Sequence, residues 1–383
     1  MNSETQDATG AAKPPAPDRD VAKFLISSTC DLADRFQSPA LTIAEALPGL
    51  RDRAGYQRRT AANGGRYAFT LAFRTAAADQ GGVIIPTYEH VADMMCTYLA
   101  VLYGKRFDNH GALEFSGLFG LPNLRAMDQI ADGAFPSNTA SRRADLGFDL
   151  SLSQVARLTP LMFGQAGRSH DASIFRGAAK YYLRALQAAE PDIEVAYLHL
   201  ITAGEILSTA IDIPQDQLLD AKTQEQLARI ANELAGGAPI ARAMRKKLRS
   251  VKARFVATFR HLVDAPFFDR AEAQTSYARL RREEFRKVLG AAYDLRSAYV
   301  HSGETFGDWV APRGTAMEEV QSGRPMVQDK AFAKTLAAAP TFIGLERIVR
   351  YGLLRFAERL QVDTQMEPAA PAPERHARGG GEL

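Results

Sequence analysis

Arg296 and His301 are the two side chains whose types and spacing best fit acid–base chemistry on a phosphate ester. Histidine has a reference pKa of about 6.5, so its ring can accept and release a proton near neutral pH. Arginine stays charged and offers a planar set of N–H donors that matches a phosphate group. The pair therefore predicts a site in which His301 is a general base or acid and Arg296 clamps a phosphate and stabilises the transition state.

The spacing of this pair limits how it can work. Five residues at about 100° each place Arg296 and His301 roughly 140° apart on an ideal helix. They share a face only if the helix ends or bends near Ser302 and Gly303, or if a two-fold dimer brings two pairs to one cleft. The alternative is structural: His301 interacts with the dipole at a helix C-terminus, and Arg296 pairs with a core carboxylate such as Glu205.

Glu205 lies in a stretch that is otherwise apolar on nearly every face. A buried carboxylate is costly unless it is paired, so Glu205 either orients Arg296 or satisfies another buried donor. The preceding residue is Gly204, which lets another backbone approach closely.

The helices that must position these groups begin near residue 170. Apolar residues recur at helical spacing, with glycine or proline at several boundaries, and Pro191 is expected at the first position of its helix. The last helix is expected to break at Pro340. The expected helices are Ala172–Ala189, Pro191 to about Ile211, Gln217–Leu234, Ile240–Val263, Ser276–His301 and Ala331–Leu360.

The region from 21 to 165 has mixed signals and predicts an α+β domain. Short runs rich in aromatic and β-branched residues predict strands, and an apolar segment at 91–103 predicts a buried helix. A Gly-bounded turn between strands is expected to hold Lys105, Arg106 and His110. The expected helical segments are Val21–Phe36, Leu41–Leu50 and Val91–Tyr103, and the expected strands are Arg66–Phe73, Gly82–Tyr88 and Glu114–Phe119.

These elements predict a mostly α protein with four parts. They are a disordered leader (1–20), the α+β domain (21–165), a C-terminal helical bundle (170–361) and a disordered tail (362–383). The leader and tail are rich in proline, alanine and polar residues, and the leader has no apolar segment typical of a secretory signal.

Composition excludes several function classes. The 383 residues are 46% hydrophobic and 24% charged, which is ordinary for a globular protein. Cys30 and Cys96 lie among apolar neighbours and are expected to be buried free thiols; no Cys/His cluster predicts a metal site. No apolar run reaches the ~18 residues that a membrane helix needs, so a soluble, cytoplasmic protein is expected.

The residues around the pair resemble a known family. Residues 293–303 read Tyr-Asp-Leu-Arg-Ser-Ala-Tyr-Val-His-Ser-Gly, and this Arg-x4-His pattern resembles the motif of the HEPN superfamily, in particular its Apea-like group. The apolar helix that bears Glu205 resembles a Glu-bearing helix of that family. The order of parts also agrees: apolar helix, basic helical region, motif helix, terminal helix. The resemblance covers about residues 172–360.

The resemblance implies a metal-independent endoribonuclease that works as a homodimer without a cofactor. RNA carries its own nucleophile, the 2′-hydroxyl, so one base and one acid suffice to cut the strand into a 2′,3′-cyclic phosphate and a 5′-hydroxyl. His301 and Arg296 take the roles given above, Ser297 donates a hydrogen bond to a phosphate oxygen, and Glu205 belongs to the same site. The resemblance also implies a toxin-like or defence-related role, in which the α+β domain senses or recruits a protein partner.

A basic stretch next to the motif fits an RNA partner. Residues 242–254 hold seven positive side chains and no acid, and residues 279–287 add five more against Glu283 and Glu284. Such a run either tracks phosphates or is a solvated helix face. The candidate RNA contacts are Arg242, Arg245, Lys246, Lys247, Arg249 and Arg282.

Two other function classes stay open. The bundle could be a non-catalytic module that binds RNA or nucleotides, or that dimerises. Nucleotidyl transfer is disfavoured, because the N-terminal region has no Gly-Ser followed by paired aspartates.

Overall fold

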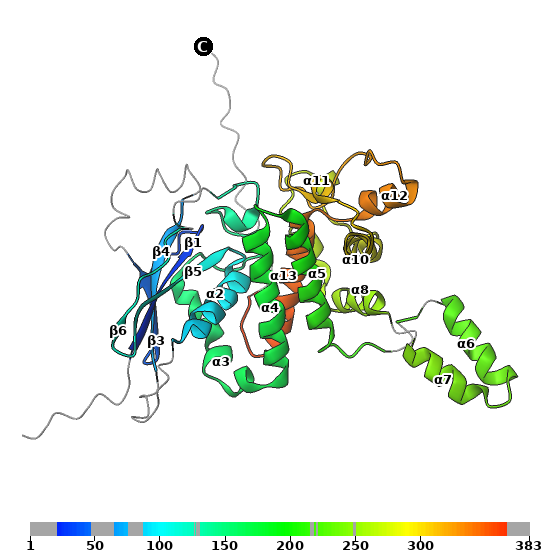
Figure 1. Cartoon of the computed structure of the whole chain (residues 1–383), viewed down its shortest axis with the longest axis horizontal. Coiled ribbons are helices and arrows are strands. Elements are labelled where there is room, and N and C mark those ends of the chain that lie inside the picture. Colours follow the sequence, from blue (N-terminus) through cyan, green and yellow to red (C-terminus); the bar gives the residue numbers. More distant parts are fainter. Residues whose placement is uncertain are drawn as a thin grey trace, which may run out of the picture.

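A computed structural model describes residues 21–46, 65–75, 87–125, 127, 131–214, 218–219, 221–247 and 250–365, without the side chains of 246 and 247. Within these residues the protein is mostly helical, with one antiparallel sheet at one end of the molecule (Figure 1). This agrees with the expected combination of an N-terminal α+β region and C-terminal helices. No helix in the described part of the chain has the length and hydropathy to cross a membrane.

The sheet has six strands in the order β2-β3-β4-β1-β5-β6, and each neighbouring pair is antiparallel. The predicted strand at Arg66–Phe73 is confirmed as β4, and the run at Glu114–Phe119 belongs to the β5–β6 hairpin. Of the predicted strand Gly82–Tyr88, residues 82–86 lie outside the described residues, and Tyr88 is the N-cap of a helix. The strands are β1 (Val21–Ser28), β2 (Phe36–Gln37), β3 (Leu41–Glu45), β4 (Tyr67–Arg74), β5 (Phe107–Phe115) and β6 (Leu118–Phe119).

The prediction of helical segments at Val21–Phe36 and Leu41–Leu50 is wrong over the described residues. Ala22, Phe24 and Ile26 are fully buried on one face of β1, which is the period-two pattern of a strand. Pairing with β4 on one side and β5 on the other overrides the weak local helix propensity.

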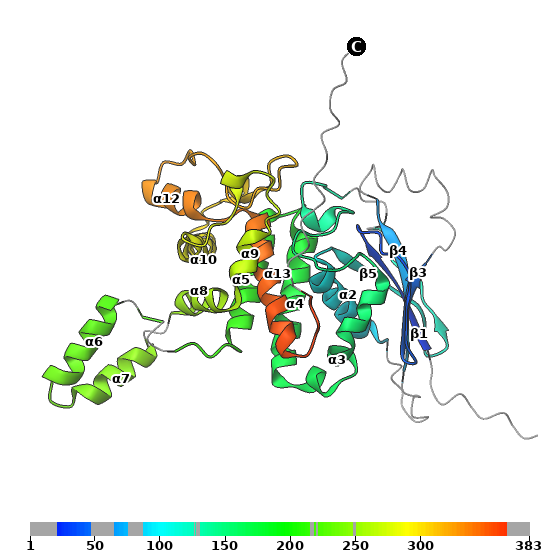
Figure 2. The same ribbon diagram turned by 180° about the vertical axis from the view of Figure 1, so that it is seen from behind.

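Helix α2 (Glu89–Tyr103) confirms the predicted buried helix and packs between the sheet and the helical part of the molecule (Figures 1 and 2). It ends at Gly104, whose φ of 63° suits glycine. A Cβ at Gly104 would also lie 2.7 Å from the side chain of Arg350. The turn therefore requires glycine on both counts.

The helical part is built around α13 (Phe342–Arg359), which has α4 (His170–Ala188), α5 (Ile193–Ser208) and α8 (Val251–Leu262) among its neighbours. The helix α10 (Phe285–Ser302) lies against α5, α8 and α12 (Lys330–Ala338). Two further helices, α6 (Ala221–Glu233) and α7 (Gly237–Lys247), pack on each other and project as an arm (Figure 2). The short helices are α3 (Thr159–Met162), α9 (Ala265–Asp269), α11 (Gly307–Val310), and the 3₁₀ helices η1 (Pro136–Asn138), η2 (Leu152–Leu158), η3 (Gln165–Arg168) and η5 (Ser276–Ala278).

Several predicted helix boundaries need correction. Pro191 is not at the first helical position, because Asp192 is the N-cap of α5 and accepts a bond from the Val195 N–H at 3.0 Å. The expected single helix at Ile240–Val263 is two, since Ser250 caps a new helix. The expected helix at Ser276–His301 begins only at Phe285. The break at Pro340 is confirmed, because it separates α12 from α13.

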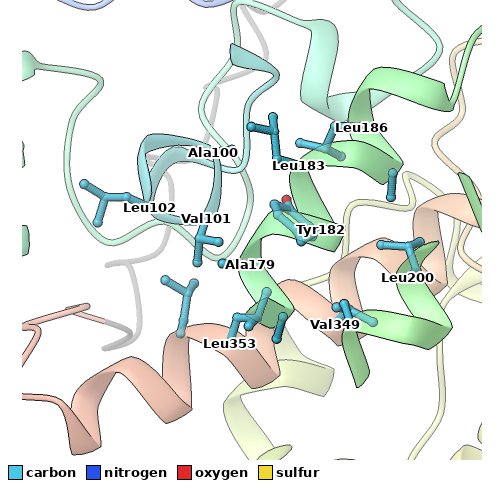
Figure 3. Packing of buried hydrophobic residues seen from close by; sticks show 14 of the residues in the cluster. Ala100, Val101, Leu102, Ala179, Tyr182, Leu183, Leu186, Leu200, Val349 and Leu353 are labelled. Carbon is cyan, nitrogen blue, oxygen red and sulfur yellow. The ribbon is translucent and has the colours of Figure 1, made fainter. Parts of the chain in front are cut away.

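One hydrophobic core runs from the sheet into the helices. Figure 3 shows Val101 of α2, Tyr182 of α4, Leu200 of α5 and Leu353 of α13 gathered in one cluster. This core crosses the expected boundary between 165 and 170, so the division into two domains stays a prediction. Both cysteines are buried free thiols, as expected.

Buried ion pairs join the same elements. Arg350 of α13 bonds Asp145 at 2.5 Å, and Arg143 bonds Glu346 of α13 at 2.6 Å. All four side chains are at most 3% exposed. Removing one partner of such a buried ion pair strongly lowers stability, because the remaining partner would be an uncompensated buried charge.

The prediction that disorder begins at 362 is wrong for 362–365. Val362 and Thr364 are each 3% exposed, and Asp363 pairs with Arg157. The apolar and polar contacts of these four residues extend the helical part past α13. Residues 1–20 and 366–383 lie outside the described residues.

Candidate functional site

The two motif residues lie on α10, near its C-terminal end. The helix stops at Ser302, and Gly303 takes a left-handed conformation with φ 69° while its N–H bonds the Tyr299 carbonyl. This is the expected end of the helix directly after the motif. Residues 300–303 at this end are exposed, so the last turn of α10 can face solvent or another chain.

Arg296 belongs to a small polar cluster between α10 and α5. Its guanidinium lies 4.0 Å from a carboxylate oxygen of Glu205, and its charged carbon lies 5.8 Å from the ring centroid of Tyr293. The Tyr293 hydroxyl donates to the other oxygen of Glu205 at 2.8 Å. Glu205 thus lies opposite Arg296 and also accepts a hydrogen bond from a second donor.

This cluster is half-buried. The side chains of Arg296 and Glu205 are 29% and 21% exposed, so the guanidinium keeps access to a ligand. Burial and the hydrogen bond to Glu205 raise the pKa of Tyr293 to about 12, so this phenol stays protonated as a donor at neutral pH. The arrangement sets a carboxylate and a phenol ring beside the Arg296 guanidinium and leaves part of this side chain exposed.

His301 is exposed at the last turn of α10. It forms no hydrogen bond or ion pair with any other residue that the structure describes. Its position at a helix C-terminus also fits the structural alternative, in which the imidazole interacts with the helix dipole. Within one chain, no described contact joins His301 to Arg296, in agreement with their separation around the helix. Ser297, one turn before His301, is half-buried.

Gly204 allows close packing, but of side chains and not of another backbone as expected. A Cβ at this position would lie 2.4 Å from the Phe255 ring and 2.6 Å from the Phe259 ring. The glycine therefore lets α8 pack tightly on the helix that carries Glu205.

The candidate RNA contacts fall in two places. Arg242 and Arg245 are exposed on α7 of the projecting arm, whereas the side chains of Lys246, Lys247 and Arg249 lie outside the described part. Arg282 is exposed just before α10, 5.9 Å from the ring centroid of Phe268. The basic run is thus divided between the arm and the body of the molecule.

A cleft of about 1580 Å³ separates the base of the arm from the body. Its walls come from α8, α10 and α12 and from Leu218, Leu219, Ala221 and Thr223. Five positive side chains line it together with two carboxylates: Lys252, Arg260, Arg286, Lys287 and Lys334, with Glu283 and Asp294. Arg296 and His301 are not in its lining.

Sequence reasoning placed Lys105, Arg106 and His110 wrongly. All three are buried, and His110 lies within β5, where its ring bonds the Ser27 hydroxyl at 2.7 Å. The Lys105 ammonium donates to the carbonyls of Pro136 and Thr139 at 2.6 and 2.7 Å. These groups are part of the interior and not of a turn between strands.

The cleft and the buried ion pairs of α13 were not predicted. A signal for the ion pairs existed, because Glu346, Arg347 and Arg350 interrupt an apolar helix. Nothing in the local sequence shows that α8, α10 and α12 converge. Over the residues described, no group of three or more His, Cys, Asp or Glu side chains is arranged to hold a metal ion.

Comparison of the chain with protein-family models, with curated proteins and with solved structures finds no match.

Proposed function

We propose that this chain is a metal-independent endoribonuclease of HEPN type that acts as a homodimer. The observation that carries the proposal is the exposed imidazole of His301 at the C-terminal end of α10, on the same helix as a guanidinium that lies 4.0 Å from Glu205. A histidine enclosed in the core could not reach a phosphodiester, and this one is accessible.

The chemistry requires two proton transfers. A base removes the proton of the RNA 2′-hydroxyl, the oxygen attacks the adjacent phosphorus, and the bond to the 5′-oxygen breaks as an acid protonates that leaving oxygen. Histidine can perform either transfer near neutral pH. Arg296 neutralises charge that builds on the phosphoryl oxygens. The products are a 2′,3′-cyclic phosphate and a 5′-hydroxyl.

A dimer supplies the geometry that one chain lacks. Arg296 and His301 are roughly 140° apart around α10, so a single copy cannot direct both at one phosphate from one helix face. A two-fold axis near the open end of α10 would bring His301 of one protomer toward Arg296 of the other. Activity should therefore depend on protein concentration in the range where the dimer forms.

The deciding experiment is His301→Ala measured on a single-stranded RNA. Cleavage should fall by at least about 100-fold, the lower bound typical for loss of a general acid or base, while thermal unfolding stays unchanged because the side chain is exposed. His90→Ala is the matched control, since His90 is an exposed histidine of α2. Cleavage should also survive EDTA.

Two results would refute the proposal. One is full activity of the His301→Ala protein; the other is activity that disappears with a chelator and returns with a divalent metal.

A second candidate function is RNA binding without cleavage. It is favoured by the cleft, whose positive lining includes neither motif residue. Tight RNA binding by a protein that yields no cyclic phosphate would support this alternative. The toxin-like or defence-related role and a protein partner for the α+β region remain part of the proposal as expectations from the family resemblance.

A further inference from the structure

The cleft between α8, α10 and α12 has the chemistry of a site for a chain of phosphates. Its positive side chains come from three separate helices: Lys252 and Arg260 from α8, Arg286 and Lys287 from α10, and Lys334 from α12. They therefore surround the cleft and are not one solvated helix face. Such an arrangement attracts an extended polyanion.

Most of these positive side chains are exposed and free to bind a phosphate. Arg260, Arg286, Lys287 and Lys334 are exposed, and none forms an ion pair with another residue in the described part of the chain. The exception is Lys252, which bonds both oxygens of Asp294 at 2.6 Å. This pair also neutralises a carboxylate that would otherwise repel a phosphate.

The size of the cleft argues against a small ligand. Its volume of about 1580 Å³ exceeds the roughly 300–1,000 Å³ of typical small-molecule pockets. None of its lining residues is Phe, Tyr or Trp, and the imidazole of His261 is the one aromatic ring among the described residues that line it, so base stacking has at most one partner there. Recognition would rest on phosphates, with strong salt dependence and little sequence preference.

The cleft also leads to the candidate catalytic histidine. Lys287, Asp294 and His301 follow each other at seven-residue intervals along α10, so each is only about 20° from the last around the helix. Lys287 and Asp294 line the cleft, and His301 continues this stripe about 10 Å beyond Asp294. A strand that follows the stripe out of the cleft reaches the imidazole.

We propose that this cleft holds the phosphate backbone of single-stranded RNA and delivers the strand along α10 to His301. The inference rests on the proposed function for its ligand class. It goes beyond the proposed function by assigning the substrate to Arg260, Arg286, Lys287 and Lys334, none of which is among the RNA contacts expected from the sequence.

The test uses the full chain and a fluorescein-labelled oligouridylate whose 2′-hydroxyls are methylated, so that it binds but cannot be cut. Binding is measured by fluorescence anisotropy over a series of KCl concentrations. For Arg286→Gln with Lys287→Gln, affinity should fall several-fold, and the slope of log K against log salt should become shallower by about 1.4, or 0.7 for each lost phosphate contact. The control Lys180→Gln with Arg184→Gln removes two exposed charges from α4 and should match the wild type.

The outcomes separate this inference from the proposed function. A wild-type slope in the cleft variant, or no RNA binding by the wild type, would overturn the cleft assignment. If uridine monophosphate displaced the oligonucleotide at equal phosphate concentration, the site would be one for a small phosphate ligand, and the strand assignment would be wrong. Binding that depends on Arg286 and Lys287 without cleavage of unmodified RNA would keep the cleft and refute the ribonuclease.

Discussion

At the scale of single residues, Glu205 and Tyr293 lie beside the Arg296 guanidinium and leave part of this side chain accessible to a ligand. The carboxylate lies 4.0 Å from Arg296 and accepts the phenol hydrogen bond at 2.8 Å. Because this ion pair is partly exposed, it contributes little to stability, on the order of 0–1 kcal/mol. Its role in the proposed enzyme is to orient Arg296.

Glu205→Gln should therefore show whether Glu205 acts by orienting Arg296 or by stabilising the fold. The amide oxygen can still accept from Tyr293, whereas the charge facing Arg296 is lost. We expect the free energy of unfolding to change by less than about 1 kcal/mol, while kcat for RNA cleavage falls and KM changes little, because Arg296 acts mainly on the transition state. Chemical denaturation and steady-state kinetics measure the two effects.

A purely structural role for Glu205 predicts the opposite pattern. Stability would then fall with kcat unaltered. Arg296→Lys provides a second check, because a lysine keeps the charge but not the planar fork of donors, and should restore only part of the activity lost in Arg296→Ala.

At the scale of elements, the arm of α6 and α7 has few contacts with the rest of the molecule. Within α6 only Leu227 is buried, and Ala241 is buried on α7, while the two helices stand away from the body (Figure 1). The arm begins beside the cleft, because Ala221 and Thr223 of α6 line it. Charges on α7 can thus extend the positive field of the cleft without taking part in the fold.

Arg242→Gln with Arg245→Gln should weaken RNA binding and leave stability within about 0.5 kcal/mol, as for most exposed positions. The salt slope should become shallower by up to about 1.4 if both side chains contact phosphates. Lys222→Gln with Arg229→Gln on α6 is the matched control, since it removes two exposed charges from the same arm. Equal losses in both variants would mean that only the net charge of the arm matters, and α7 would not be a contact surface.

At the scale of the whole molecule, one core and a set of buried charges join the sheet to the helices. Lys105 belongs to this interior: it is fully buried, and burial lowers its pKa to about 7. An unfolded lysine titrates near 10.4. Between these values the unfolded chain binds one more proton than the folded protein, so stability rises with pH.

The free energy of unfolding should accordingly increase from pH 7 to 8.5, with a slope approaching about 1.4 kcal/mol per pH unit for this one group. Below pH 7 both states are protonated and the slope from Lys105 disappears. The rise ends near pH 8.5, because burial raises the pKa of Cys30 to about 12 and also raises the pKa of Cys96, and the two unfolded thiols, with a reference pKa of about 8.5, ionise around that pH and offset the lysine slope. Urea denaturation at several pH values measures the slope, and Lys105→Met should remove it; an equal slope in that variant would assign it to other groups.

The sequence alone determined the features that depend on local pattern. It predicted the mostly helical character after residue 170, the buried helix at 91–103, the break at Pro340 and the end of the motif helix near Gly303, because helical periodicity, glycine and proline act over a few residues. It also singled out Arg296, Glu205 and His301 as candidate site residues, because their residue types suggest their chemistry, and this assignment stays a prediction.

Only the tertiary structure decided what depends on partners distant in the chain. Val21–Ser28 became a strand because β4 and β5 pair with its two edges, which no local propensity can show. Lys105 is accommodated in the core because the carbonyls of Pro136 and Thr139 accept hydrogen bonds from its ammonium group. The cleft likewise exists because α8, α10 and α12, far apart in sequence, meet in space.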